Sequence, residues 1–101
     1  MSLLTRLILL NPGTIQTHPE MGVGLVQRYR YAMEGSEVQL QSDIRMQIDK
    51  YLPQFQGANV VVKFKDHAFQ ILIRIDNLAF AILYDIETNT IEEKFTKLED
   101  L

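Results

Sequence analysis

Three apolar segments between residues 58 and 86 are separated by two polar dipeptides, and this spacing constrains the fold more than any other feature of the sequence. The dipeptides, Asp66-His67 and Asp76-Asn77, stand where two-residue β-hairpin loops are expected. If both are loops, large apolar residues of neighbouring segments face one another. The expected pairs are Phe64–Phe69, Val62–Ile71, Val60–Ile73, Ile75–Leu78, Ile73–Phe80, Ile71–Ile82 and Phe69–Tyr84. A shift of one residue would mix the two faces throughout, so the sequence predicts an antiparallel β-meander in this register.

The second face of this meander is more apolar than a solvated face would be. Its side chains are Val61, Lys63, Lys65, Gln70, Leu72, Arg74, Ala79, Ala81, Leu83 and Asp85. In the predicted register, Val61, Leu72 and Ala81 form one row across the strands, beside a row of Lys63, Gln70 and Leu83. An apolar strip within a charged surround is typical of a protein interface. Coverage by the N-terminal hairpin or the C-terminal segment of the same chain would explain the strip equally well.

Residues 36–52 carry the clearest helical pattern. One apolar stripe at spacings of three and four is formed by Leu40, Ile44, Ile48, Tyr51 and Leu52. Ser36 and Gln39 have the spacing of a capping box, in which each side chain accepts or donates at the other residue's backbone. Pro53 ends the helix, because the residue before a proline is disfavoured in the α region.

The N-terminal third is expected to be extended. The turn-forming residues 11–14 (Asn-Pro-Gly-Thr) predict a hairpin of residues 6–10 with residues 14–17. Residues 19–24 should form an ordered loop, because Gly22 and Gly24 can adopt backbone angles that other residues avoid. The expected fold is α+β: one main helix packed on a small antiparallel meander, with an N-terminal β-hairpin. With 101 residues and 11.7 kDa, the chain fits a single domain, residues 1–101.

Composition excludes several classes of protein. There is no cysteine, so disulfides and thiolate chemistry are excluded. The longest apolar run, residues 78–84, is far shorter than the roughly 20 residues that span a bilayer. We expect neither membrane insertion nor a secretory signal peptide, since no basic segment precedes the N-terminal leucines. The net charge of −3 argues against a nucleic-acid partner.

Residues with catalytic or ligand-binding chemistry are sparse. His18 and His67 lack metal-ligand spacing, so we expect no metal and no cofactor. A glycan hydrolase would need two carboxylates, for which Glu20 with Glu34 or Glu37 are the candidates. A small RNA-binding module could use the arginines and tyrosines of residues 28–31. An alternating strand or a packed aromatic segment explains those four residues more simply.

An ordered series of short motifs resembles a known family. The motifs are residues 7–13 (LILLNPG), residues 18–25 (HPEMGVGL), residues 48–53 (IDKYLP), residues 60–62 (VVV) and residues 71–75 (ILIRI). Their order resembles the baseplate wedge, sheath-initiator family of contractile phage tails, related to phage protein W and to the TssE subunit of type VI secretion. The resemblance covers roughly residues 6–86. It implies a structural subunit that docks on neighbouring baseplate proteins and initiates assembly of the tail sheath.

Two positions depart from the family pattern. Met21 stands where relatives have phenylalanine, and Leu52-Pro53-Gln54 replaces a Glu-Pro-Arg that relatives use for docking. The expected partner-binding residues are Glu20, Met21, Leu52, Pro53, Gln54, Ala81 and Leu83. The family has also carried a lysozyme-like label, but no convincing acid–nucleophile pair occurs here, so we expect no enzyme.

The resemblance also implies partners and a location. The partners would be other wedge proteins and tail sheath subunits, with tail tube or hub proteins as further candidates. The location would be the baseplate of the virion tail, assembled in the cytoplasm of the bacterial host. We expect binding by β-strand addition at the sheet edge formed by residues 79–86. Lys63 and Lys65 should discourage pairing at the opposite edge.

Overall fold

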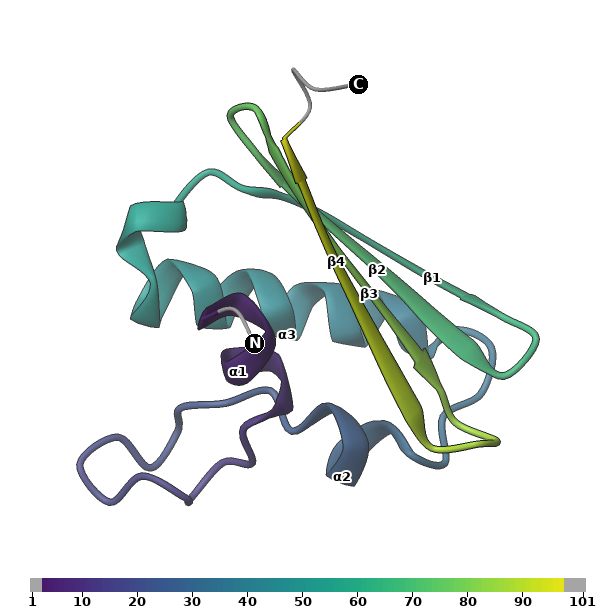
Figure 1. Cartoon of the computed structure of the whole chain (residues 1–101). Coiled ribbons are helices and arrows are strands. Elements are labelled where there is room, and N and C mark those ends of the chain that lie inside the picture. Colours follow the sequence, from purple (N-terminus) through teal and green to yellow (C-terminus); the bar gives the residue numbers. More distant parts are fainter. Residues whose placement is uncertain (1–2, 98–101) are drawn as a thin grey trace.

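The computed structural model describes residues 3–97, which form an α+β domain, as expected. Its elements are α1 (Leu3–Leu9), α2 (Leu25–Tyr29), α3 (Ser36–Tyr51), the 3-10 turn η1 (Pro53–Phe55), β1 (Asn59–Lys65), β2 (Ala68–Ile75), β3 (Leu78–Asp85) and β4 (Thr90–Lys97). The strands form one antiparallel sheet in the order β1-β2-β3-β4. The helices gather on one face of this twisted sheet, where α3 crosses behind the strands (Figure 1).

The predicted register of the meander is confirmed at every pair. Phe64 faces Phe69 on β1 and β2, and Ile71 faces Ile82 on β2 and β3. Both two-residue loops are present. Asp66 and His67 have φ values of 53° and 63°, the left-handed angles that match a tight turn to the twist of its strands. All large apolar partners therefore lie on the face that meets α3.

The fourth strand corrects one expectation. Residues 79–86 do not form a sheet edge, because β4 pairs along the whole of β3, with Leu83 opposite Glu92 and Ala81 opposite Lys94. The turn before β4 is held by Asp85, whose carboxylate accepts the backbone N–H groups of Glu87 and Thr88 at 3.0 and 3.2 Å. The mostly polar sequence of β4 does not predict a strand.

The prediction of an N-terminal hairpin is also wrong, because residues 3–9 form the helix α1. Leu4, Leu7 and Ile8 are buried at helical spacing and join the core. The expected turn does form, with the Thr14 N–H donating to the Asn11 carbonyl at 3.2 Å, but it leads into an exposed loop instead of a second strand. A run rich in leucine and isoleucine satisfies both helical and strand patterns, and contact with the helical layer favours the helix here.

Helix α3 begins at Ser36, as predicted, but its N-terminal cap differs from the predicted one. Gly35 occupies the cap position with φ 102° and has no side chain that could cap the helix. The capping box of Ser36 and Gln39 is absent, since the Ser36 hydroxyl accepts the Met33 N–H instead. At the other end, the helix stops at Tyr51, before Pro53, as predicted. The buried apolar residues of α3 are Leu40, Ile44 and Ile48, and Leu52 follows them at the cap.

Gly22 is the tightest point of the N-terminal loop. Its φ is 116°, as its predicted role requires, and a Cβ atom there would collide with the Leu10 backbone, lying 2.8 Å from the carbonyl carbon. The loop closes on α1 through two backbone bonds. Val23 and Gly24 donate their N–H groups to the carbonyls of Leu7 and Leu10 at 3.1 and 2.9 Å.

We expect Gly22→Ala to lower the free energy of unfolding by more than about 2 kcal/mol, because backbone strain adds to the collision with Leu10. Gly13→Ala is the matched control: Gly13 also has a positive φ, 92°, but open space surrounds the position of its Cβ. It should cost only the strain, about 1 kcal/mol. Urea denaturation of the two variants measures both values. Equal losses would contradict the close approach at Gly22.

Candidate protein-binding surfaces

The loop that carries Glu20 and Met21 is held on α3 by the side chain of Gln47. The Gly22 N–H donates to Gln47 Oε1 at 2.7 Å, and Gln47 Nε2 donates to the Glu20 carbonyl at 3.0 Å. Gln47 is itself buried. An amide that pairs with both a donor and an acceptor of one loop fixes the backbone conformation of that loop. The pattern that reveals α3 gives no sign of this role.

The two expected binding residues of this loop differ in exposure. Glu20 is exposed, and its carboxylate lies 2.9 Å from Lys50 Nζ. The hydrogen bond and the charge of Lys50 lower the pKa of the Glu20 carboxyl. Met21 is half-buried against the core. Gly22 and Leu25 are buried, while Pro19 is exposed. The loop is thus a packed element with Glu20 on its outside.

At the end of α3, the three expected docking residues separate. Leu52 is only 7% exposed and packs in the core, so the expectation that it contacts a partner is wrong. Leu52 extends the buried apolar stripe of α3 and packs in the same core, so a partner could not reach the Leu52 side chain. Pro53 and Gln54 lie in η1 and are exposed, so they stay available for contact.

Residues 28–31 divide between the interior and the surface. Tyr29 is buried, and its hydroxyl donates to the carboxylate of Asp43 on α3. Arg28 lies 3.3 Å from the same carboxylate and donates to the Val23 carbonyl at 3.1 Å. Tyr31 is 84% exposed, with the Arg30 guanidinium 5.2 Å from its ring centre. The packed aromatic interpretation therefore holds for Tyr29, on a short helix instead of a strand.

The Tyr29 hydroxyl gives a pH dependence with a definite sign. Burial, and then the hydrogen bond to Asp43, raise the pKa of Tyr29 above its ordinary value of 10. A raised pKa stabilises the fold fully below about pH 10, and this contribution is lost as the pH rises, at about 1.4 kcal/mol per pH unit.

Tyr29→Phe should therefore be less stable than the wild type at pH 8, by about 1–3 kcal/mol, because the carboxylate of Asp43 loses a donor. By pH 11 the difference should shrink by about 1.4 kcal/mol. Urea denaturation at both pH values measures this. Tyr31→Phe, at an exposed ring, should match the wild type at each. A difference that is the same at pH 8 and pH 11 would contradict the role of the Tyr29 hydroxyl.

The face of the sheet away from the helices is the apolar surface expected from the sequence, and the described helices all lie on the opposite face (Figure 1). We call it the outer face and define it by the outward side chains of the four strands. The observed pairing confirms both predicted rows and extends each with a residue of β4: Val61–Leu72–Ala81–Lys94 and Lys63–Gln70–Leu83–Glu92. Ala81 and Leu83, the expected contact residues, are half-buried here.

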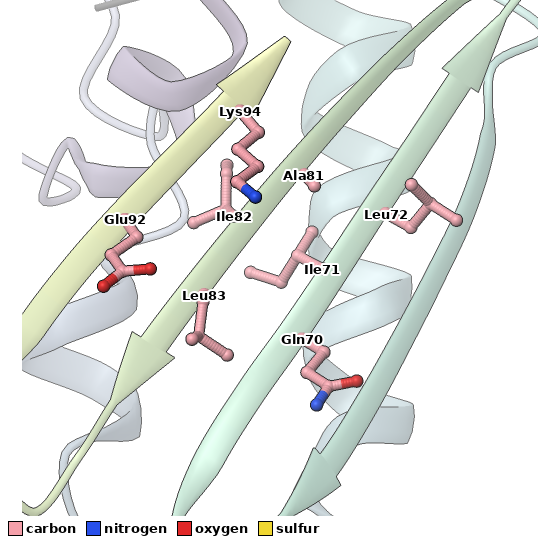
Figure 2. Close-up of a pocket in the computed structure, with 8 residues that line it drawn as sticks. All are labelled: Gln70, Ile71, Leu72, Ala81, Ile82, Leu83, Glu92 and Lys94. Carbon is pink, nitrogen blue, oxygen red and sulfur yellow. The ribbon is translucent and has the colours of Figure 1, made fainter. Parts of the chain in front are cut away.

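A hollow of about 340 Å³ lies on the outer face. It is lined by Gln70, Ile71, Leu72, Ala81, Ile82, Leu83, Glu92 and Lys94. Figure 2 shows the side chain of Leu83 between Glu92 of β4 and Gln70 of β2, with Lys94 leaning from β4 towards Ala81. The small side chain of Ala81, between the larger Leu72 and Lys94, leaves this depression open.

The two edges of the sheet differ in how open they are. On β1, the N–H of Val62 points away from β2 and donates to Gln41 Oε1 of α3 at 3.1 Å, so the helix occupies part of this edge. Hydrogen bonding alternates along antiparallel strands. The bond from the Ile86 N–H to the His67 carbonyl, at 2.8 Å, agrees with the same alternation between β2 and β3. Because this alternation continues across β3 to β4, the backbone N–H and C=O groups of Ile91 and Glu93 point outward, away from β3.

No family model, no curated protein and no solved structure matches this chain. Within residues 3–97, no helix is long and apolar enough to cross a membrane, and no three His, Asp or Glu side chains converge as metal ligands.

Proposed function

We propose that this chain is a structural subunit of a contractile-tail baseplate, a wedge component that docks on neighbouring baseplate proteins and initiates tail sheath assembly. The motifs of residues 6–86 support the family, and the open edge of β4 supports the mode of binding. The partners are other wedge proteins and sheath subunits. The site of action is the baseplate of the virion tail, assembled in the cytoplasm of the bacterial host.

The single observation behind the mode of binding is the outward backbone of β4. An edge strand with unpaired N–H and C=O groups is completed by a strand from a partner. On β1, the Val62 N–H already donates to the Gln41 side chain, whereas no described strand lies beyond β4. β4 contains no proline, so each of its residues keeps a backbone donor. Strand addition is therefore assigned to β4 and not to residues 79–86.

The alternative of a glycan hydrolase finds no support in the carboxylates proposed for it. A general acid in such an enzyme has a raised pKa, but Lys50 lowers the pKa of Glu20. Glu37 accepts the Gly35 N–H at 3.0 Å at the start of α3, and Glu34 is exposed. An RNA-binding module is not supported either, because Arg28 and Tyr29 are engaged with Asp43.

Glu93→Pro tests strand addition at β4. Proline removes the outward N–H of Glu93, which contributes no bond to β3, so the domain should fold with nearly unchanged stability. The variant is expressed in a bacterial host that produces tail particles without this chain, and sheathed tails are counted by electron microscopy. We expect the variant to enter no sheathed tail.

Glu93→Ala is the matched control, since it removes the same side chain but keeps the backbone donor. It should restore sheathed tails to the level of the wild type. Glu92→Pro instead removes a donor to β3 and should lower the melting temperature. If Glu93→Pro restores sheathed tails as well as Glu93→Ala does, strand addition at β4 is excluded.

A further inference from the structure

The outer face has an ordered distribution of charge. In the row that begins at Lys63, the basic end lies on β1 and the acidic end, Glu92, on β4. In the next row, Lys65 lies on β1 and Asp85 on β3. Antiparallel pairing sets both rows perpendicular to the strands, so the face is basic along β1 and acidic at the opposite side of these rows. The apolar strip of Leu72, Ala81 and Leu83 lies near the middle.

A surface of this kind is complementary to itself under one two-fold rotation. An axis parallel to the strands, between two stacked sheets, sets β1 of one copy over β4 of the other and keeps each row opposite itself. Lys63 then faces Glu92 of the second copy, and Lys65 lies diagonally across from Asp85. The other face-to-face rotation, about an axis across the strands, would stack the lysines of β1 on β1. Only the first arrangement sets carboxylates opposite the lysines of β1, because the second brings β1 over β1 and leaves Lys94 of β4 as the cation nearest to Glu92.

Side-chain size agrees with the same arrangement. In the row Val61–Leu72–Ala81–Lys94, reversal sets Leu72 over Ala81 of the second copy, and Ala81 under Leu72 in return. The hollow of about 340 Å³ around Ala81 is where that leucine would enter. In the neighbouring row, where Arg74 and Ala79 are cross-strand partners, the same reversal sets Arg74 over the small Ala79 of the second copy. Lys94 lies over Val61, along which its aliphatic stem can pack.

From this complementarity of charge and size, we propose that two copies of this chain pair in solution, outer face to outer face, as a two-fold β-sandwich with roughly aligned strands. Four strands at about 4.8 Å spacing and about 25 Å length give roughly 500 Å² per copy, so about 1,000 Å² is buried in all. This is at the lower limit for specific interfaces, so the pair is weak and exchanges readily. It leaves the backbone edge of β4 open and is independent of the proposed place in a baseplate.

Sedimentation equilibrium of the full chain, loaded from about 10 μM to about 1 mM, tests the pairing in the range where weak pairs dissociate. We expect a monomer at the low end and a growing dimer fraction at the high end. Lys63→Glu and Glu92→Lys should each weaken the dimer about tenfold, because either change sets like charges opposite one another at two symmetric positions. The double variant Lys63→Glu/Glu92→Lys should return to within about threefold of the wild type.

Two further variants separate this face from other surfaces. Arg45→Glu makes the same change of charge on the exposed side of α3 and should leave dimerisation unchanged. Ala81→Leu fills the hollow and should weaken the dimer, while circular dichroism and the melting temperature show an intact fold. A monomer at every concentration overturns the proposal, as does a dimer that the single reversals leave unchanged. Failure of the double variant to restore pairing overturns the orientation that joins Lys63 to Glu92.

Discussion

The antiparallel pairing of β1, β2 and β3 through two tight turns determines where the side chains and backbone groups of the sheet point. Because side chains alternate between faces, this one register puts Ile71 and Ile82 beneath the helices and Leu72 and Ala81 outside. Backbone hydrogen bonds alternate in the same way, so the outward N–H on β1 reaches Gln41 and its counterparts on β4 point to solvent. The proposed binding edge and the proposed self-pairing face both follow from that register.

The helical layer depends on polar contacts as much as on apolar ones. Asp43 and Gln47, one turn apart on α3, join the helix to the short helix α2 and to the loop around Gly22. In the described part of the chain, no buried side-chain nitrogen or oxygen lacks a partner. Buried polar groups are tolerated only when they are paired, so these contacts specify one position for the N-terminal loop, which apolar packing alone would leave less defined.

These two layers give the molecule surfaces with different properties. On the helical side, contacts within the chain hold α2 and the N-terminal loop on α3, and Leu52 is buried there. The sheet side offers a backbone edge on β4 and an apolar strip between charged ends. Backbone groups at a sheet edge can bind partner strands of many sequences. Rows of charged and apolar side chains bind only a partner with a complementary pattern. Strand addition at β4 and self-pairing of the outer face therefore use separate groups and can occur on the same subunit.

The sequence alone determined the meander register, the extent of α3 and the positive φ of Gly22, because each follows from spacing or backbone chemistry within a few residues. Tertiary structure decided the rest. The leucine-rich residues 3–9 fit helix and strand patterns alike, and packing selected the helix α1. The polar residues of β4 become a strand only because β3 offers an edge beside them. Burial of Asp43 and Gln47 depends on partners 14 and 25 residues away, Tyr29 and Gly22, which no local pattern reveals.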